Sequence, residues 1–512
     1  MKRLPIGIQT FSEIITENYL YVDKTDRILE LIKNGKYYFV SRPRRFGKSL
    51  LISTLDSIFN GRKELFQGLY IYEKLEWKKY PVIRLDLSLV SGKDPNQLET
   101  SLSFRLSQIA EQNGIVLHSE YCTDRFQELI LGLSKNGKAA VLIDEYDKPI
   151  IDHLGNPAVA EQNREILRNF FGVIKGCDEY LRFVLLTGVS KFSQVSIFSG
   201  LNNIRDITLS KESSSLFGYT EEELKMYFRD RIAELAASFG VSNDEFMKKI
   251  QKWYNGYSWD GIIKVYNPFS IMMFFNEGAF RNYWFESGTP SFLVSYIKDH
   301  HMEIPKIEKT EITYETFSSF ALDNIQFSSL LFQTGYLTVV KSASFEYQQY
   351  FVLDYPNEEV RNSFFTHITA SFLKDRTPAE VDPVILEMRR YLQKEDLKLF
   401  FEKLQSLFAS VPYTLHLPYE AYYHSLFYMV LRLLGFRTET EVLTDKGRID
   451  GIMELNDKIY IIEIKLDRPE KAIEQIRGRK YAEKFIGSEK KIILLGIGYI
   501  DRDISFIRED FY

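Results

Sequence analysis

The segment Tyr37-Tyr-Phe-Val-Ser-Arg-Pro-Arg-Arg-Phe-Gly47-Lys48-Ser49-Leu-Leu decides the fold of this chain. A short apolar strand leads into a basic turn, and Gly-Lys-Ser then opens an apolar helix. A lysine and a hydroxyl at the head of a helix are the groups that hold the phosphates and the magnesium ion of a nucleotide. The pattern G-x-x-x-x-G-K-[ST] expects a glycine at position 42, where this chain has Arg42. The segment therefore predicts a phosphate-binding loop (P-loop) of altered shape.

Strands alternate with helices along the N-terminal part of the chain. Four apolar runs have strand character: 81–88, 139–145, 181–188 and 204–209. Three segments between them have a helical pattern: 97–112, 124–135 and 159–175. This alternation is typical of a parallel sheet that is covered by helices on both faces. We therefore expect residues 1–215 to form an α/β nucleotide-binding domain, with the loop strand as its fifth strand.

Two acids stand at the end of the apolar run Ala139-Ala-Val-Leu-Ile, namely Asp144 and Glu145. An aspartate at a strand tip can hold Mg²⁺ through water, and a neighbouring glutamate can polarise an attacking water. The alternative is a strand that simply ends in charged residues. However, the strand follows the loop in the chain, and this order of the two elements favours a nucleotide site. Thr187, at the end of the next strand, is a weaker signal: its hydroxyl would lie beside the γ-phosphate or in solvent.

The basic turn of the loop carries Arg42, Arg44 and Arg45. Three interpretations stay open for these side chains: they contact phosphates, they contact nucleic acid, or they form a solvated basic turn.

The character of the chain changes at Leu216. Thr220 followed by Glu223 predicts a capped helix start, with Thr220 as N-cap. Helical patterns then continue to about residue 410, with short β-like stretches at 336–340 and 350–353. We expect residues 216–410 to form a helical lid and connecting region.

The last hundred residues form a further α/β pattern. Helices are predicted at 419–434 and 469–486, and strands at 437–443, 448–454, 458–466 and 491–496. Residues 411–512 are therefore predicted to be a small domain of their own.

This C-terminal region brings two carboxylates and a lysine together. Glu463 and Lys465 lie two residues apart on one predicted strand, so they share a face, and a hairpin would bring Asp450 alongside them. Two carboxylates can bind Mg²⁺, and a lysine can activate water or steady a phosphorane-like charge. The alternative is an edge strand whose exposed face carries a Glu–Lys pair. Accessory candidates are a third acid, Glu420, and five groups that follow: Gln475, Tyr481 and the basic Arg477, Arg479 and Lys480.

Composition excludes several classes of protein. A net charge of −5 over 512 residues excludes a uniformly basic nucleic-acid binder, so any such binding needs local patches. The two cysteines form no metal motif and no disulfide framework. Apolar runs are too short to cross a membrane, and the N-terminus lacks the apolar core of a signal peptide. We expect a cytoplasmic protein that does not associate with membranes.

Across nearly its whole length the chain resembles the bacterial family that joins an AAA-ATPase-like domain to a PD-(D/E)XK nuclease-superfamily domain. The resemblance rests on these stretches: Leu4-Pro-Ile-Gly-Ile, Tyr21-Val-Asp-Lys-Thr25, Arg42-Pro-Arg-Arg-Phe-Gly-Lys-Ser49, Leu142-Ile-Asp-Glu-Tyr-Asp-Lys-Pro149, Trp253-Tyr-Asn-Gly-Tyr, Tyr266-Asn-Pro, Gln333-Thr-Gly-Tyr-Leu-Thr338, Pro356-Asn-Glu-Glu-Val-Arg361, Gly447-Arg-Ile-Asp450 and Glu463-Ile-Lys465. It implies an α/β architecture with a P-loop sheet domain, a helical lid and a nuclease-like α/β domain.

The resemblance also implies roles for individual residues. It assigns ATP binding to Arg45, Phe46, Gly47, Lys48, Ser49, Leu50 and Asp144. It assigns Mg²⁺ to Ser49 and Asp144 in the first domain and to Asp450 and Glu463 in the last. The implied catalytic residues are Glu145 for ATP hydrolysis and Asp450, Glu463 and Lys465 for phosphodiester cleavage.

Two hypotheses about function follow. In the first, an ATPase gates a magnesium-dependent nuclease, whose partner is nucleic acid, with DNA expected rather than RNA. In the second, ATP binding controls a regulatory switch, and the nuclease fold is a catalytically idle module that binds nucleic acid or a protein partner. Assembly into a homo-oligomer is open in both.

Overall fold

The computed structural model describes residues 1–153, 155–190, 201, 203–284, 293–294, 296–297, 304–318, 326–373, 377–409, 419–438, 449–479, 481–500 and 503–511. At 318, 419–424, 437–438, 449–450, 481 and 484 it describes the main chain alone. The chain divides into two compact units: the first comprises Met1–Ser287 with Lys309–Val360, and the second Gly288–Glu308 with Arg361–Tyr512.

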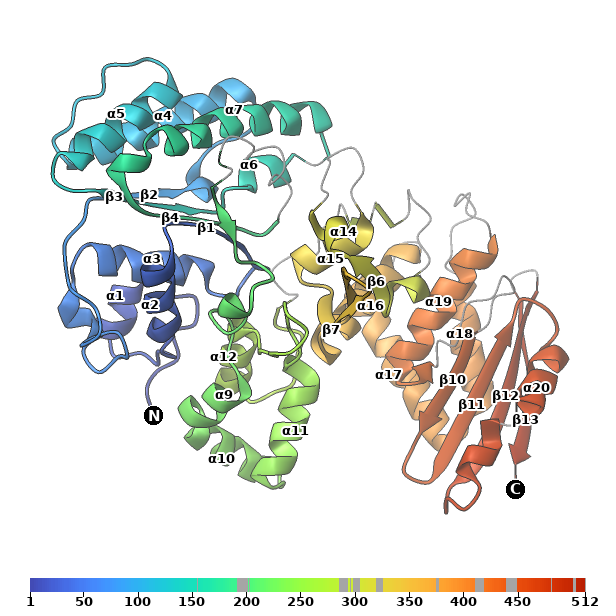
Figure 1. Cartoon of the computed structure of the whole chain (residues 1–512). Coiled ribbons are helices and arrows are strands. Elements are labelled where there is room, and N and C mark those ends of the chain that lie inside the picture. The colour runs from blue at the N-terminus through green and yellow to red at the C-terminus, as the bar shows by residue number, and fades with distance from the viewer. Residues whose placement is uncertain are drawn as a thin grey trace. The chain divides into compact units, whose positions relative to one another are not determined.

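A five-stranded parallel sheet is the centre of the first unit (Figure 1). Its strands are β1 (Tyr37–Ser41), β2 (Val82–Asp86), β3 (Ala139–Asp144), β4 (Leu181–Gly188) and β5 (Arg205–Asp206). They lie in the order β2-β3-β4-β1-β5, and each neighbouring pair is parallel. The predicted α/β class and its parallel sheet are thus confirmed, although the run 204–209 forms only the two-residue strand β5.

Helices cover both faces of this sheet (Figure 1). One face carries α1 (Phe11–Thr16), α2 (Thr25–Asn34) and α3 (Lys48–Phe59); the other carries α4 (Pro95–Gln112), α5 (Cys122–Ser134) and α7 (Pro157–Gly176). The short helix α6 (Lys148–Ile151) follows β3. Because both faces are covered, every residue of β1 and of β3 is buried.

The strand order determines which residues meet at the carboxyl edge of the sheet. Strand β4 lies between β1, which leads into the P-loop, and β3, which ends at Asp144. The amide of Arg42 donates to the carbonyl of Gly188 at 3.1 Å, and the amide of Tyr146 donates to the carbonyl of Thr187 at 3.1 Å. The segments that follow β1, β3 and β4 are therefore held together at one edge.

Four helices follow the sheet domain in the same unit: α9 (Glu221–Tyr227), α10 (Arg229–Ser238), α11 (Asn243–Tyr254) and α12 (Pro268–Glu277). The predicted capping box is confirmed, since Thr220 Oγ1 accepts from the amide of Glu223 and Glu223 Oε2 accepts from the amide of Thr220. An aromatic-rich core, including Phe246, Tyr254 and Phe274, packs these helices together. The segment from α9 to α12, with the residues that precede it from Leu216, is called the lid below.

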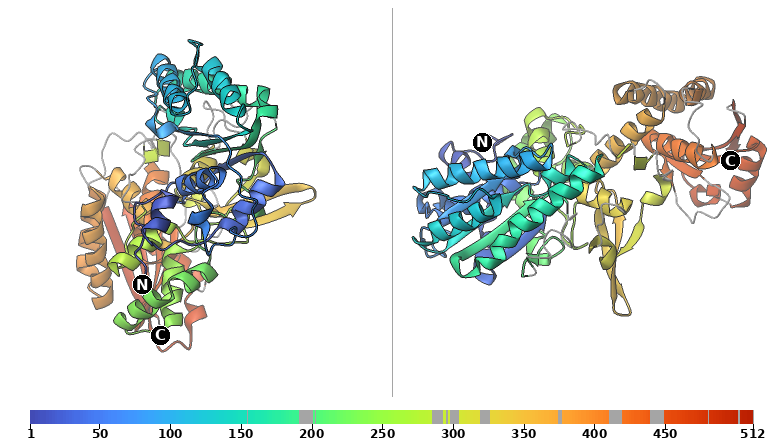
Figure 2. Two further views of the ribbon diagram at one scale, coloured as in Figure 1. Left: turned by 90° about the vertical axis from the view of Figure 1, so that its left-hand side faces the viewer. Right: turned by 90° about the horizontal axis from the view of Figure 1, so that it is seen from above.

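A small antiparallel sheet completes the first unit. It consists of β6 (Thr310–Thr313), β7 (Thr338–Phe345) and β8 (Gln348–Asp354) in the order β6-β8-β7, with α14 (Tyr314–Ser318) and α15 (Phe327–Thr334) before the hairpin. The β7–β8 hairpin stands out from its surroundings in Figure 2. The sequence predicted β structure near 336–340 and 350–353, but it gave no sign of β6.

The second unit contains a five-stranded mixed sheet. Its strands are β9 (Arg437–Thr438), β10 (Ile449–Glu454), β11 (Lys458–Lys465), β12 (Lys491–Ile500) and β13 (Asp503–Phe511), in the order β13-β12-β11-β10-β9. Helix α20 (Pro469–Gly478) covers one face, and α17 (Pro378–Lys394), α18 (Leu397–Ala409) and α19 (Tyr419–Leu434) lie on the other (Figure 1). Helix α16 (Glu358–Phe372) precedes them.

Two details of this C-terminal pattern differ from the prediction. The predicted helix 469–486 ends as an α-helix at Gly478, and a 3₁₀ turn, Tyr481–Phe485, follows it. Strand β13 was not predicted, because its sequence Asp503-Ile-Ser-Phe-Ile-Arg-Glu-Asp-Phe511 is half polar; it pairs along its whole length with β12. No helix among the described residues is long and apolar enough to cross a membrane.

Candidate functional site

The P-loop brings an uncapped helix end to the carboxyl edge of the parallel sheet. Helix α3 begins at Lys48, and its N-cap, Gly47, has left-handed backbone with φ 89° and offers no side-chain cap. The first amides of a helix lack partners inside the helix, and together with the helix dipole they favour an anion. The main chain of residues 47–49 therefore fits a phosphate group.

Lys48 lies folded against its own loop. Its ammonium group donates to the carbonyl of Arg42 at 2.9 Å and to that of Pro43 at 3.0 Å. Burial lowers the pKa of Lys48 below its ordinary value, whereas the nearby charges of Asp144 and Glu145 raise it. Among the described residues its hydrogen bonds go to these two carbonyl oxygens alone, so this buried cation is well placed to transfer to phosphate oxygens.

The acids after β3 lie next to this lysine. Asp144 is buried and accepts hydrogen bonds from the Ser49 hydroxyl and from the amide of Glu145, the latter at 3.0 Å. Burial raises the pKa of both carboxyls above the ordinary carboxyl range. Glu145 has a left-handed backbone with φ 49°, an uncommon conformation for a residue other than glycine. The structure thus brings Lys48, Ser49, Asp144 and Glu145 into one cluster.

Asp147 is a member of this edge for which sequence reasoning gave no role. Its Oδ2 accepts hydrogen bonds from the amide of Ser190 at 2.6 Å, from the Ser190 hydroxyl at 2.7 Å and from the amide of Val189 at 3.1 Å. It therefore fixes the turn after β3 to the end of β4, where the buried Thr187 lies. The signal was the second aspartate of Asp144-Glu-Tyr-Asp147, opposite the Gly-Val-Ser sequence after Thr187.

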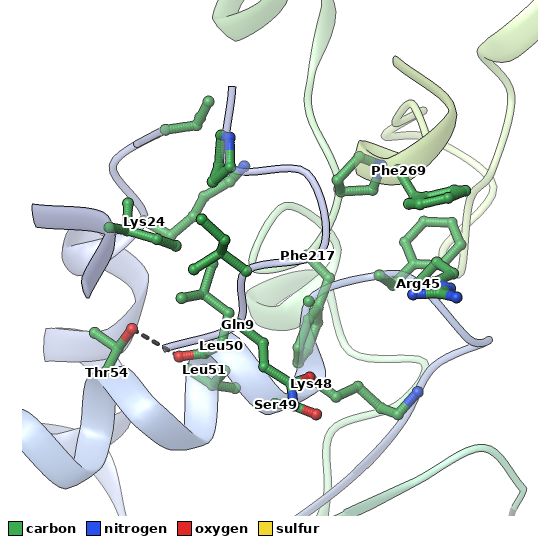
Figure 3. A pocket seen from close by; sticks show the side chains of 18 of the residues that line it. Gln9, Lys24, Arg45, Lys48, Ser49, Leu50, Leu51, Thr54, Phe217 and Phe269 are labelled. Atoms are coloured by element: carbon green, nitrogen blue, oxygen red, sulfur yellow. Dashed lines mark hydrogen bonds between the residues drawn. The ribbon is translucent and has the colours of Figure 1, made fainter. Parts of the chain in front are cut away.

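A pocket of about 490 Å³ extends from the P-loop (Figure 3). Its phosphate end is lined by Arg44 to Leu51, with Glu145 and Lys148. The remaining wall, called the far end below, is mostly apolar, and its Phe269 reaches back to Arg45. It comes from three segments: the N-terminal residues Pro5, Gly7, Ile8 and Gln9, the residues Leu20, Tyr21, Val22 and Lys24, and the lid residues Leu216–Tyr219, Pro268, Phe269 and Met272. An apolar slot beside a phosphate site fits a flat nucleotide base.

The far end of the pocket was not predicted. Most of its N-terminal residues belong to Leu4-Pro-Ile-Gly-Ile and Tyr21-Val-Asp-Lys-Thr25, two stretches that supported the family resemblance without a role. Lys24 anchors this wall to the lid, since its ammonium group donates to both carboxylate oxygens of Glu223 at 2.6 Å and to the carbonyl of Ser215 at 2.8 Å.

Arg42 fits none of the three interpretations left open for the loop arginines. Its guanidinium is 1% exposed and donates to the carbonyls of Ser41, Thr208 and Ser213 and to the Ser213 hydroxyl at 2.8–3.0 Å. It also lies 3.9 Å from the ring centre of Trp259. Burial lowers its pKa from the ordinary 12.5 to about 9. Arg42 is therefore a buried anchor between the loop and the residues that lead into the lid.

The next residues of the loop also contact the lid. Phe46 is buried and packs edge-on against Tyr257 and Trp259, at ring-centre distances of 4.8 and 5.4 Å. The Arg45 guanidinium lies 4.7 Å from the ring centre of Phe269, and Figure 3 shows the two side chains together at the wall of the pocket. Leu50 lines the pocket from the first turn of α3.

The second group of predicted site residues lies on two neighbouring strands of the C-terminal sheet, β10 and the middle strand β11. Asp450 of β10 is paired in register with Glu463 of β11, so positions 450, 463 and 465 belong to one face of the sheet. The Glu463 carboxylate is fully buried and lies 2.9 Å from the ammonium group of Lys465. The edge-strand alternative is wrong, because β11 has neighbours on both sides and Glu463 is inaccessible to solvent.

This face is the one that α20 covers. Ile459 and Ile461 of β11 share it and pack against Ile473 and Ile476 of α20. Gly496 of β12 lies beside Glu463, and a Cβ atom there would come 2.5 Å from Ile473 and 2.7 Å from the carbonyl of Pro469. The glycine therefore lets the first turn of α20 approach Glu463.

The accessory candidates do not all lie on the face of the sheet that carries Glu463. Helix α19, which carries Glu420, packs against the opposite face, where Gly451 approaches Leu431. Gln475 lies on α20, and its Nε2 is buried without a hydrogen-bond partner in the part of the chain that the structure describes. Tyr481 begins the 3₁₀ turn, Arg477 is paired with Glu509 of β13, and Arg479 lies directly after α20. Lys480, Gly447 and Arg448 lie outside the described residues.

Comparisons with known proteins match two parts of the chain to family models. Residues 5–198 match a family model described as a predicted AAA-ATPase, and residues 418–509 match one described as the PD-(D/E)XK nuclease superfamily. An uncharacterized protein encoded in the vnfD 5′ region of Azotobacter chroococcum mcd 1 is 39% identical, over 97% of this chain and 96% of its own length. No solved structure matches the chain.

Proposed function

Because this chain belongs to the family that joins an AAA-ATPase-like domain to a PD-(D/E)XK nuclease-superfamily domain, we propose that it binds and hydrolyses ATP and thereby gates a magnesium-dependent nuclease at its C-terminus. The observation that carries the proposal is the cluster of Lys48, Ser49 and Glu145 in the wall of a pocket, with the buried Asp144 directly behind them, hydrogen-bonded to Ser49. The proposed organisation is an ATPase domain at 1–215, a lid and connecting region at 216–410 and a nuclease domain at 411–512.

The fit of ATP to the first site rests on three features of the chain. The uncapped start of α3 offers amides to the phosphates, Lys48 supplies a cation, and the apolar far end accepts the base. The Ser49 hydroxyl and the buried Asp144 carboxylate form the hard-oxygen set that would hold Mg²⁺. When bound, that ion would neutralise phosphate charge.

Hydrolysis then needs a base for water and charge stabilisation for the phosphoryl group. The oxygen of the water forms a bond to the γ-phosphorus, and Glu145 takes a proton from that water. The bond from that phosphorus to the bridging oxygen breaks, and ADP and phosphate are the products. Lys48 leaves the carbonyls of Arg42 and Pro43 and binds the phosphate oxygens instead.

For the C-terminal site we propose phosphodiester hydrolysis in nucleic acid, with DNA as the first substrate to try. The buried Glu463 carboxylate forms an ion pair with Lys465 at 2.9 Å and accepts no hydrogen bond from the other described residues, which fits a ligand for a hard cation. Asp450 would hold the same Mg²⁺, which would supply Lewis-acid activation when bound. Lys465 is placed to orient the attacking water and to balance negative charge on the phosphate.

The proposed gate rests on the contacts between the P-loop and the lid. Arg42, Arg45 and Phe46 each contact lid residues, so a loop that rearranges around phosphates also changes the position of the lid.

We propose that the protein acts in the cytoplasm. The two free cysteine thiols, Cys122 and Cys177, support this location.

The ATPase part is tested by calorimetric titration of ATP and by phosphate release from the intact protein, in the wild type and in Lys48→Ala. We expect the variant to lose binding by about 100-fold or more. Arg229→Ala is the matched control, because this arginine is 83% exposed on α10 and does not line the pocket. Equal ATP affinity in the wild type and Lys48→Ala would overturn the assignment.

The nuclease part is tested with labelled single-stranded and double-stranded DNA and RNA in the presence of Mg²⁺. Asp450→Ala and Glu463→Gln are expected to abolish cleavage and to leave ATP binding intact. If cleavage by the wild type is absent with every substrate while ATP binding changes nucleic-acid affinity, the switch with an idle nuclease fold is the better account.

A further inference from the structure

The three arginines of the P-loop have three different environments. Arg42 is a buried anchor, and Arg45 lies over Phe269. The Arg44 side chain is exposed and lines the pocket. Within the described residues its guanidinium has no hydrogen-bond or ion-pair partner, although its main chain is held, since Trp284 Nε1 donates to its carbonyl at 3.4 Å.

The other cations around the pocket are already engaged. Lys24 is paired with Glu223 at the far end, and Lys148 is paired with Asp152 at 2.6 Å. The lid contributes no charged side chain to the pocket wall; its residues there are Leu216, Phe217, Gly218, Tyr219, Pro268, Phe269 and Met272. Arg45 is engaged with Phe269, and Lys48 with two main-chain carbonyls. Among the described residues that line the pocket, Arg44 is therefore the cation whose side chain has no hydrogen-bond, ion-pair or ring partner.

Arg44 lies on the side of the loop where the last phosphate is expected. Lys48 reaches back to the carbonyls of residues 42 and 43, directly before Arg44, and the Arg44 charge is close enough to lower the pKa of Lys48. In a P-loop this lysine reaches the β- and γ-phosphates. The carboxylates of Asp144 and Glu145 are also near Lys48.

We propose that Arg44 is the catalytic residue that recognises the terminal phosphate of a nucleoside triphosphate and neutralises the charge that builds on it during hydrolysis. The proposal rests on the function proposed above and deepens it. The P-loop itself would supply, within one chain, the arginine that other NTPases receive from a separate segment or from a partner. A guanidinium suits this task because its donors form a fork that matches phosphate oxygens.

Two consequences follow from this placement. The protein distinguishes ATP from ADP mainly through one side chain, because ADP lacks the phosphate that Arg44 contacts. It also hydrolyses ATP without an arginine from a second copy, so the specific activity does not depend on protein concentration.

The test compares the intact wild type with Arg44→Ala, Arg44→Lys and the exposed-arginine control Arg229→Ala. Affinities for ADP and for a non-hydrolysable ATP analogue are measured by calorimetry, and turnover by phosphate release. Arg44→Ala should weaken the ATP analogue by about tenfold or more, change ADP by less than about threefold and lower kcat by about 1000-fold. Arg44→Lys should recover part of the affinity for the analogue, and Arg229→Ala should match the wild type.

The opposite results separate the two proposals. If Arg44→Ala weakens ADP and the ATP analogue equally, or changes neither while Lys48→Ala abolishes both, the role of Arg44 is overturned and the ATP site stands. If Lys48→Ala also leaves both affinities unchanged, the ATP site itself is wrong. An unchanged thermal unfolding midpoint for Arg44→Ala, expected because the side chain is exposed, shows that the variant is folded.

Discussion

The ammonium group of Lys48 donates a hydrogen bond of 2.9 Å to the main-chain carbonyl of Arg42. The side chain of Arg42 in turn is buried, 3.9 Å from the ring centre of Trp259. One residue therefore belongs to the phosphate loop through its main chain and to the lid contact through its side chain. Occupation of the loop by phosphates must break the first contact, and this is where we expect nucleotide binding and lid position to be coupled.

The first prediction concerns this anchor. Arg42→Ala removes four hydrogen bonds and two cation–π contacts, with Trp259 and Phe217, from a buried site. We expect the free energy of unfolding of the unit that contains it to fall by about 2–4 kcal/mol. Urea unfolding followed by tryptophan fluorescence measures it, with Arg229→Ala as the control. A midpoint equal to that of the wild type would show that the anchor is dispensable.

The second prediction separates ATP binding from ATP hydrolysis. Glu145→Gln keeps the shape of the side chain but removes the base, so we expect wild-type affinity for ATP and phosphate release slower by about 100-fold or more. Pre-steady-state quench measurements report the chemical step. A variant with unchanged turnover would remove Glu145 from the base role.

The pH dependence of turnover gives an independent test of Glu145 as the base. A general base must be unprotonated, and burial raises the pKa of Glu145 above the ordinary 4.5. Turnover should therefore fall, as the pH is lowered, through a pKa that lies above 4.5. An acid limb at or below 4.5 would contradict the buried carboxyl as the base.

Much of this fold could be predicted from the sequence, for physical reasons that differ between elements. Strands such as Ala139–Asp144 are continuous apolar runs because both their faces are buried, and the box of Thr220 and Glu223 marks a helix start through local chemistry alone. Strand β13 escaped prediction because it lies at the sheet edge, where polar residues are tolerated.

The candidate sites, too, could be predicted from the sequence only in part. The Gly-Lys-Ser turn and the strand-end acids are adjacent in sequence to the elements that position them, so a pattern is enough to find them. The burial of Arg42 could not be predicted, because its partners Thr208, Ser213 and Trp259 are distant in the chain and only the tertiary fold brings them together. The far end of the pocket was missed for the same reason, since three separate segments build it.

The third prediction concerns the glycine beside Glu463. Gly496→Ala places a Cβ atom 2.5 Å from Ile473, so α20 must move away from β12. We expect a loss of about 1–3 kcal/mol in unfolding free energy, together with weaker nucleic-acid cleavage, because Glu463 lies beside this contact. Gly478→Ala, on α20 itself, is the matched control: beyond its chain neighbours and the helix backbone, no atom of the described residues lies within 4 Å of the new methyl, so the change should be neutral or stabilising. Equal effects at the two positions would show that the approach of α20 is not tight.

The fourth prediction is a pH effect on stability. Glu395 lies 3.2 Å from Lys458, 2.8 Å from Lys491 and 2.9 Å from Arg508, and these partners depress its pKa from the ordinary 4.5 to about 2. A depressed carboxyl pKa stabilises the folded state above the unfolded pKa, and the gain is lost as the pH falls from about 4.5 towards about 2. The side chain is partly exposed, so we expect a contribution of about 1 kcal/mol.

The measurement for Glu395 is the difference in unfolding free energy between the wild type and Glu395→Gln across this pH range. The difference should be largest at neutral pH and should shrink as the pH is lowered through the window. A difference that stays constant with pH would show that the ion pairs contribute nothing.

The most direct test of the whole account is the ATP dependence of nucleic-acid cleavage by the intact protein with Mg²⁺. Cleavage should require ATP in the wild type, be lost in Lys48→Ala although its Asp450, Glu463 and Lys465 are intact, and be lost in Glu463→Gln although that variant still hydrolyses ATP. Cleavage at the same rate with and without ATP, and equally fast in Lys48→Ala, would contradict the claim that the N-terminal site gates the C-terminal one.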